Sequence, residues 1–425
     1  MNETDMPGPT KDPYRTKWRV LTAGFSAYTF DAMDFMFLAI TIPLLITEFD
    51  LTVGQAGLLG TGTLVGVGLS CIIMGWFADN YGRKRALMVG VAIFGIFTGV
   101  TGLAESYEAI LILRFLAGIG LGGIWGVIAA FINETWPPHQ RGRAAAFVFS
   151  SWPIGYGLAA LLAAVVLPAA GWRALFFCGF AALAVVVYIY FFVPESEEWQ
   201  REKTIRDASE GREPSARVRD LFKGSLLAPT LLGTSAATFA LIGYWGVNTW
   251  IPTYLMTERG FDVGMMPWFI VIMNVGMFTG YQLFGYLADR IGGRNSLILT
   301  FAGAAVLVPL YANAEGLLAL FLLGPIMAVF FSYSGIFGSY FANLYPAHIR
   351  SLGAGFCFDI GRGLSAVSPF ALGIIAERNS LSFSIALCGI SFAIAGLICF
   401  AMPRVSSETA VGVSVGFTHQ TTGKP

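Results

Sequence analysis

The sequence predicts an all-α membrane protein whose twelve transmembrane helices form two pseudo-symmetric bundles of six. Of its 425 residues, 56% are hydrophobic and 12% are charged, whereas charged residues make up about 25% of an ordinary soluble domain. Twelve spans of about 20 residues need about 240 residues, which a chain of this length supplies. A polar, glycine-containing stretch also occurs twice, about half the chain length apart, which indicates two related halves.

The first copy of the repeat runs from Gly75 to Arg85 and reads GWFADNYGRKR, and the second reads GYLADRIGGR. Four positions of the first copy correspond to positions 210 residues later: Gly75, Asp79, Gly82 and Lys84 to Gly285, Asp289, Gly292 and Arg294. A second set repeats at an offset of 209: Pro137, His139 and Arg141 to Pro346, His348 and Arg350. The glycines allow a tight loop between helices, and the charged side chains can bond the free backbone groups at helix ends.

Apolar runs bounded by charged or turn residues give the positions of the helices. The expected spans are 18–47, 55–77, 86–104, 108–133, 142–168, 173–193, 226–256, 265–287, 296–312, 316–341, 351–376 and 382–402. They divide the chain into a polar tail (1–17), a bundle (18–193), a linker (194–225), a second bundle (226–402) and a tail expected to be disordered (403–425). The linker is charged from Pro194 to Lys223 and lacks an apolar stripe long enough to span.

The positions of Lys and Arg predict the orientation, because cytoplasmic loops carry an excess of these residues. Of the 26 Lys and Arg residues, 21 fall on the side of the N-terminus and 3 on the other side. We therefore expect a multi-pass protein of the cell membrane, a bacterial inner membrane, with both termini and the linker in the cytoplasm. The net charge of zero gives no reason to expect nucleic-acid binding. We expect lipid contact and a monomer.

Five charged residues fall inside predicted spans: Asp31, Asp34, Arg114, Asp359 and Arg362. A charge at the bilayer centre costs roughly 2.5–3.5 kcal/mol on insertion scales, so such residues are expected to face a cavity or one another and to be functional. Asp31 and Asp34 are three residues apart and share a helix face. Two carboxylates that close do not both ionise easily, so one of them can take up a proton near neutral pH. The alternative is that one of them only pairs with Arg114.

Arg362 is the expected ligand of a substrate anion, because a guanidinium can hold a carboxylate through two parallel hydrogen bonds. Asp359, three residues earlier, would compete for that guanidinium, or the two would simply neutralise each other. Other polar and aromatic residues could complete a pocket, although each could equally serve packing: Tyr28, Trp152, Tyr244, Asn248, Asn274 and Tyr333.

The motif G-x-x-x-D-x-x-G-R-K at Gly75–Lys84 resembles the major facilitator superfamily, and the resemblance covers residues 18–402. It implies transport by alternating access and a cytoplasmic gate in which Asp79 and Arg83 act together, with Glu134, Arg141 and Arg350 nearby. The second copy has Gly293 in the place of Arg83, so a weaker second gate is expected. The residues assigned to the gate are Gly75, Asp79, Gly82, Arg83, Lys84, Glu134, Arg141, Asp289, Arg294 and Arg350.

Three stretches inside the spans narrow the resemblance. YTFDAMDFMF is similar to the D-G-x-D stretch of the aromatic acid:proton symporters and their sialate- and lactate-type relatives, with Ala32 in place of the glycine. RFLAGIGLGG, which begins at Arg114, resembles a pattern of proton-coupled members, and its glycines are expected to serve close helix packing. GFCFDIGRGLSAVSP looks like the helix-eleven region of carboxylate symporters, with Asp359 where a neutral residue is expected, which implies that Arg362 takes part in substrate binding. Arg114 is a second candidate for that role.

The function expected from these features is proton-coupled uptake of a small organic anion, with the proton gradient as energy source and no cofactor. Asp31, Asp34 and Asp359 are the candidates for the proton carrier. A proton-driven exporter of drugs or metabolites and a sensor that does not transport remain alternatives. An enzyme is not expected, because the chain has three histidines, all outside the predicted spans, and neither a metal-binding cluster nor a phosphate-binding loop. The acid could be an aromatic acid, a hydroxy-monocarboxylate, a dicarboxylate or a sugar acid.

Overall fold

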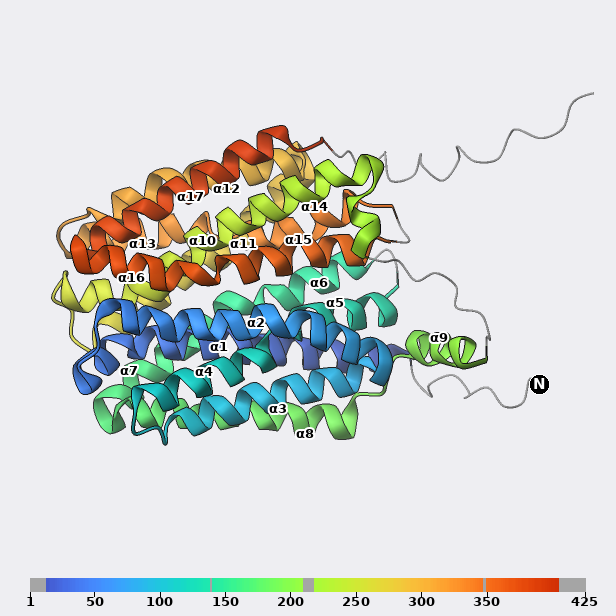
Figure 1. Ribbon diagram of the computed structural model, residues 1–425, viewed down its shortest axis with the longest axis horizontal. Helices are drawn as coiled ribbons and strands as arrows, with labels where there is room; N and C mark the ends of the chain where they lie inside the picture. Colours follow the sequence, from blue (N-terminus) through green and yellow to red (C-terminus); the bar gives the residue numbers. More distant parts are fainter. Residues whose placement is uncertain (1–12, 138–139, 209–217, 347–348, 405–425) are drawn as a thin grey trace, which may run out of the picture.

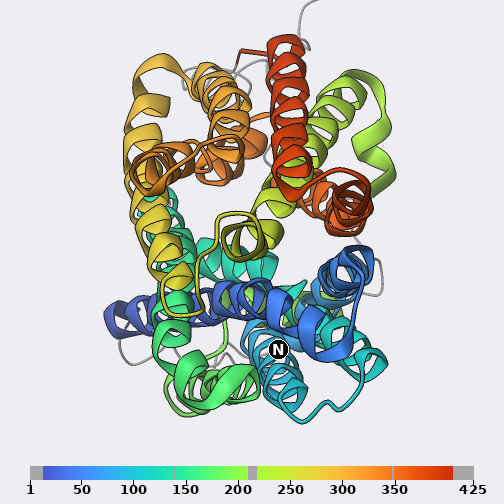
Figure 2. The same ribbon diagram turned by 90° about the vertical axis from the view of Figure 1, so that its left-hand side faces the viewer.

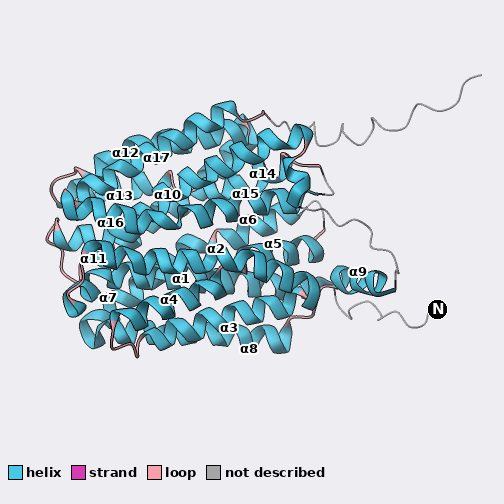
Figure 3. Cartoon of the chain, viewed as in Figure 1, coloured by secondary structure: helices cyan, strands magenta, loops and turns pink. Residues whose placement is uncertain are grey.

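The computed structural model describes residues 13–137, 140–208, 218–346 and 349–404, and in this part the chain is helical and contains no strand (Figure 3). The predictions for the tails, for His139 and for His348 therefore lie outside the described residues. The first half consists of α1 (Pro13–Phe49), α2 (Val53–Tyr81), α3 (Arg83–Thr101), α4 (Tyr107–Leu121), α5 (Ile124–Thr135), α6 (Arg141–Phe149), α7 (Ser151–Phe177), a 3-10 turn (Cys178–Ala182) and α8 (Leu183–Phe192).

The second half follows a short helix, α9 (Glu197–Ala208), and two 3-10 turns (Val218–Phe222 and Gly224–Leu226). It consists of α10 (Leu227–Thr257), α11 (Met266–Ile291), α12 (Gly293–Ala312), α13 (Leu317–Val329), α14 (Tyr333–Asn343), α15 (Arg350–Leu364), a 3-10 turn (Ser365–Val367), α16 (Ser368–Arg378) and α17 (Leu381–Ala401). Helices α1–α8 gather on one side of the molecule and α10–α17 on the other (Figures 1 and 2).

Eleven helical stretches of the described chain are long and apolar enough to cross a membrane. One of them, Arg141–Phe192, has 52 residues. A continuous helix of that length would reach about 78 Å, more than twice the ~30 Å hydrocarbon core. Gly171 breaks this stretch, because its φ of 75° and ψ of −178° are not helical. The stretch therefore contains two spans, and the described chain has the twelve that the sequence predicts.

The start of α1, helix α9 and the end of α17 lie at the same end of the molecule, which we call the terminal face; the other end is the opposite face (Figure 1). The two halves meet along α2 and α16, along α7 and α11, and along α1 and α10. At the opposite face, Glu377 of α16 accepts a hydrogen bond of 2.6 Å from the amide of Gly54 in α2. Near the middle of α2, the backbone of Gly68 lies against that of Gly363, where a side chain would not fit.

The glycines after Arg114 serve helix packing, as the sequence predicts. A side chain at Gly118 would overlap the carbonyl oxygen of Thr63, and one at Gly122 would overlap that of Val67. Helix α4 can therefore lie directly against the backbone of α2, with which it makes one of the closest helix contacts of the protein.

The repeated polar stretch is not the loop that the sequence predicts. Helix α2 continues to Tyr81 and α3 begins at Arg83, so Gly82 alone separates them, with a φ of 107°. The second copy is arranged in the same way around Gly292, whose φ is 86°. Hydropathy marks only the apolar part of a helix, whereas these helices continue beyond it as far as a glycine that can adopt a positive φ.

Candidate functional site

Arg362 lies in the last turn of α15 near the contact between the two halves, and 3% of it is exposed. Its guanidinium carbon is 5.5 Å from the ring centre of Phe35 in α1 and 5.8 Å from that of Trp245 in α10. No carboxylate of the described residues lies within ion-pair distance of it, and its Nη2 has no hydrogen-bond partner. A buried cation without a partner is costly. Arg362 is therefore a site that an anion would stabilise.

In the described structure, Asp31 is a buried acid without an ion-pair partner, just as Arg362 is a buried base without one. It lies in α1, is fully buried, and neither of its carboxylate oxygens has a hydrogen-bond partner. The charge of Arg362 acts on Asp31, although the two residues do not form an ion pair. An isolated buried carboxylate is far less costly when it is protonated. Asp31 therefore has the surroundings expected of a group that takes up a proton.

Asp34 and Arg114, which the sequence also predicts for the site, form an ion pair with each other. Arg114 Nη1 donates to Asp34 Oδ1 at 2.9 Å, and neither side chain is more than 2% exposed. Thr98 donates its hydroxyl to the same carboxylate and accepts a hydrogen bond of 3.0 Å from Arg114 Nη2. Phe176 covers the guanidinium at 5.3 Å. The pair joins α1, α3 and α4 inside the first half, which is the arrangement expected if Asp34 pairs with Arg114 for structural reasons.

Asp359 and Arg362 do not neutralise each other as an ion pair. The two residues are one turn apart in α15, but their charged groups are not within 4.0 Å of each other. Asp359 is half-buried and within the influence of the Arg362 charge. Arg362 therefore has no ion-pair partner on its own helix.

Aromatic rings from both halves surround this centre. The aromatic cluster, as we call it, consists of Tyr28, Phe35, Trp152, Tyr156, Tyr244 and Trp245. Phe35 and Trp245 lie 4.4 Å apart between ring centres, across the boundary of the two halves. Trp152 Nε1 donates to the Tyr244 hydroxyl at 2.6 Å, which links α7 to α10. The cluster brings together three residues that the sequence predicts for the pocket (Tyr28, Trp152 and Tyr244) and adds Phe35, Tyr156 and Trp245.

The remaining predicted pocket residues lie next to the cluster. Asn248 and Asn274 line a cavity of about 10 Å³ together with Met36, and each donates its side-chain amide to a carbonyl of its own helix. Tyr333 packs behind Tyr244 in the second half and donates to the carbonyl of Ala240. A cavity of 10 Å³ holds about one water molecule. This cavity is too small for an organic acid.

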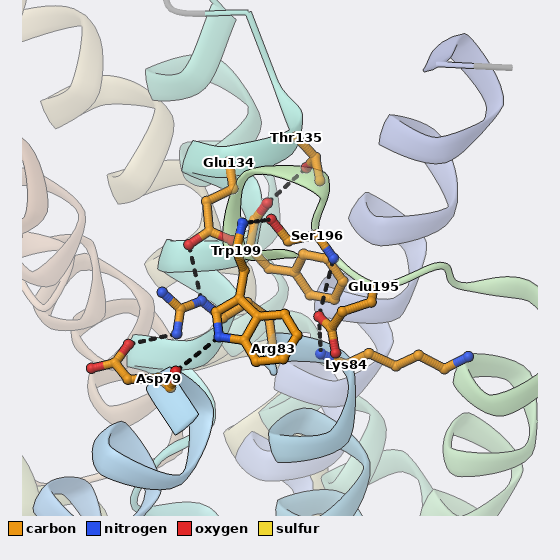
Figure 4. A network of polar contacts seen from close by, with 9 residues as sticks. Asp79, Arg83, Lys84, Glu134, Thr135, Glu195, Ser196 and Trp199 are labelled. Carbon is orange, nitrogen blue, oxygen red and sulfur yellow. Dashed lines mark hydrogen bonds and ion pairs between the residues drawn. The ribbon is translucent and has the colours of Figure 1, made fainter. Parts of the chain in front are cut away.

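The predicted gate forms a compact polar network at the terminal face of the first half (Figure 4). Arg83 Nη1 contacts Asp79 Oδ1 at 2.5 Å, and Arg83 Nε donates to Glu134 Oε1 at 2.9 Å. The turn at Gly82 thereby brings the end of α2, the start of α3 and the end of α5 together.

The network also contains residues that the sequence analysis missed. Glu195 accepts a hydrogen bond of 3.0 Å from the Lys84 amide at the start of α3, and Trp199 Nε1 donates to the Asp79 carbonyl at 2.8 Å. Trp199 is nearly buried. A tryptophan in an otherwise charged segment was the available signal, because such a side chain needs an apolar contact. The linker thus begins as part of the gate (Figure 4).

Other residues assigned to the gate have different partners. Lys84 and Arg141 donate to the carbonyls of Tyr190 and Trp136, and Arg294 donates to the carbonyls of Cys399 and Phe400. Gly75, Gly285 and Asp289 are exposed. The Arg350 side chain lies outside the described part of the structure. Since Gly293 replaces Arg83, the second copy has no counterpart of the Asp79–Arg83–Glu134 network among the described residues.

Comparison with known proteins identifies the family. The model of the Major Facilitator Superfamily matches residues 24–355. The chain belongs to this superfamily. It is 30% identical over 383 residues to a putative metabolite transport protein of Haemophilus influenzae, covering 89% of this chain and 93% of that protein. It is 29% identical over 387 residues to the cis,cis-muconate transport protein of Acinetobacter baylyi, covering 90% and 93%.

The fold agrees with this membership. The xylose transporter XylE of E. coli, in its inward open conformation, superposes with a TM-score of 0.75 at 18% identity, covering 93% of this chain and 99% of that one. This member of the Major Facilitator Superfamily is therefore a multi-pass membrane transporter and not an enzyme. Among the described residues, no group of three or more His, Cys, Asp or Glu side chains could hold a metal ion.

Proposed function

We propose that this transporter carries a small organic anion, a carboxylate, together with protons into the cell by alternating access. The observation that carries the proposal is the buried, unpaired guanidinium of Arg362 at the contact between the halves. A substrate carboxylate can form two parallel hydrogen bonds with it and compensate its charge. The proton gradient is the energy source, and no cofactor takes part.

Asp31 is the proposed proton carrier, with Asp359 as the second carboxyl near Arg362. Adding a carboxylate to the closed centre adds one negative charge, and adding a proton to Asp31 removes one. Only their joint arrival leaves the total charge of the buried centre unchanged. Because an uncompensated buried charge is costly, proton and anion each favour the binding of the other. This mutual preference is a physical basis for symport.

The aromatic cluster favours a flat, unsaturated acid over a sugar acid. Phe35 and Trp245 lie against Arg362, and four more rings complete the cluster. Ring faces and edges make up most of these surroundings, and two of the polar groups, Trp152 Nε1 and the Tyr244 hydroxyl, already bond each other, which leaves few partners for sugar hydroxyls. The relative from Acinetobacter baylyi is named for cis,cis-muconate, which is also an unsaturated carboxylate.

The terminal face is the proposed cytoplasmic side, since 21 of the 26 Lys and Arg residues belong to that side. The Asp79–Arg83–Glu134 network would then hold the cytoplasmic ends of α2, α3 and α5 together during the cycle. The contact of Glu377 with Gly54 would close the outer side and would have to open when the protein faces outward.

Uptake into proteoliposomes tests the proposal. Labelled benzoate and labelled cis,cis-muconate are offered to vesicles whose lumen is more alkaline than the medium. We expect at least one acid to accumulate above its equilibrium level and a protonophore to abolish the accumulation. If neither acid accumulates beyond that of protein-free vesicles, or if the protonophore has no effect, the proposal is wrong.

A further inference from the structure

Trp245 has an unused hydrogen-bond donor in the middle of the protein. It lies in α10, 4% of it is exposed, and its Nε1 has no partner. Most other buried indoles of the described chain do have one: Trp152, Trp172, Trp199 and Trp250 donate to Tyr244, Glu48, Asp79 and Pro369. Besides Trp245, the buried indole of Trp136 also lacks a hydrogen-bond partner among the described residues. Trp136 directly follows α5 at the terminal face and lies beside Lys17.

The unused donor of Trp245 belongs to a side chain that contacts Arg362, whose Nη2 is also unused. The Arg362 guanidinium carbon lies 5.8 Å from the Trp245 ring centre, and α10 packs against α15. Phe35 adjoins both side chains. Leaving a buried donor without a partner costs its full desolvation, so two such donors on neighbouring side chains indicate a site for an acceptor group.

An indole suits this role because its N–H can donate but cannot accept, so it cannot compete for the proton that accompanies the substrate. The ring is also held in place. Trp152 lies 6.2 Å and Tyr244 lies 5.4 Å from it between ring centres, both edge-on. A fixed donor selects the position of the group that it binds.

We propose that Trp245 is a specificity-determining residue whose Nε1–H donates to the carboxylate held by Arg362. The guanidinium and the indole together then bind both oxygens of one carboxylate, and a neutral amide, which offers one oxygen and an N–H group, fits less well. This inference rests on the proposed function, because it needs a carboxylate at Arg362.

Calorimetric titration of purified protein tests the inference with benzoate, cis,cis-muconate and the neutral analogue benzamide. Trp245→Phe keeps an aromatic ring, removes the donor and makes the side chain smaller, a change that the control below shares. We expect it to weaken binding of the tighter acid by about tenfold or more, the typical worth of a hydrogen bond to a charged group, and to reduce the preference for benzoate over benzamide. Trp136→Phe, which also removes an unused buried indole donor, is the matched control and is expected to bind like the parent.

The outcomes separate this inference from the proposed function. If the parent binds an acid and Trp245→Phe binds it equally well, the inference is wrong and the proposed function is untouched. The inference is also wrong if Trp136→Phe weakens binding as much, or if the preference for benzoate over benzamide does not change. If the parent binds neither acid, the proposed function fails and this inference fails with it.

Discussion

Replacing Arg362 by Lys separates the geometry of the guanidinium from its charge. Lysine keeps the positive charge but cannot make two parallel hydrogen bonds to one carboxylate, and it fits less well between the rings of Phe35 and Trp245. The loss of one charged hydrogen bond is worth about 1.5–3 kcal/mol. We therefore expect the dissociation constant for the best acid to rise between about tenfold and 150-fold.

Arg362 also gives a prediction for thermal stability. Most substitutions destabilise a protein, whereas replacing Arg362 by a neutral side chain is expected not to. Arg362 has no ion-pair partner in the described structure, so Arg362→Met removes a buried charge without breaking an ion pair and is expected to leave thermal unfolding unchanged or to raise its midpoint. Arg114→Met is the matched comparison, because Arg114 is paired with Asp34 at 2.9 Å. Breaking that buried pair is expected to cost roughly 3–5 kcal/mol.

Two assays on protein purified in detergent decide this prediction. Calorimetric titration gives the dissociation constants of the parent and of Arg362→Lys, and thermal unfolding compares the two methionine variants. An unchanged affinity in the lysine variant would show that the carboxylate binds elsewhere. Equal destabilisation by Arg362→Met and Arg114→Met would show that Arg362 has a structural partner after all.

Three further predictions concern the transport cycle. Asp31→Asn is expected to abolish accumulation driven by a proton gradient while exchange of labelled for unlabelled substrate continues, because exchange does not require release of the proton; equal accumulation by variant and parent would exclude Asp31. Asp79→Asn and Trp199→Phe are expected to lower turnover about two- to fivefold, the worth of a partly exposed contact, with little effect on binding; a parallel loss of affinity would place this network at the substrate site. A cysteine introduced at Asp262 is expected to react with an impermeant reagent added to intact cells, whereas one at Glu202 is not; the reverse pattern would invert the proposed orientation.

The fold and the candidate residues of the centre could be predicted from the sequence for a simple physical reason. Charges are so costly in hydrocarbon that the few inside long apolar runs had to be paired or functional. The five charged residues of the spans differ in this respect: Asp34 and Arg114 form a pair, while Asp31, Asp359 and Arg362 make no ion pair among the described residues.

The sequence could not predict which of these charged residues are paired and which are not. Asp31 and Asp34 lie three positions apart on one helix, and helical periodicity places both on the same face. Their different environments depend on Arg114, which is 80 positions from Asp34 along the chain. Contacts between helices of this kind are set by packing in three dimensions. The role proposed for Trp245 could not be predicted either, because the sequence of α10 alone does not distinguish this residue from a core side chain.

The gate shows a second limit of hydropathy. The polar residues Asp79 and Arg83 suggested a loop. In the structure both are helical, and Gly82 alone separates α2 from α3, because each helix extends beyond its apolar part. The contribution of Trp199 to this network was missed because the linker is otherwise charged, and this single tryptophan was the one sign that the segment folds back onto α2 and α5.

Counting the protons that accompany substrate binding tests the central claim most directly. Calorimetric titration of the parent with its best acid, repeated in buffers of different ionisation enthalpy near neutral pH, measures protons taken up per bound anion. Joint charge compensation at Asp31 and Arg362 predicts uptake of about one proton per carboxylate in the parent and markedly less in Asp31→Asn. Binding of the acid by the parent without any proton uptake would contradict the coupling mechanism.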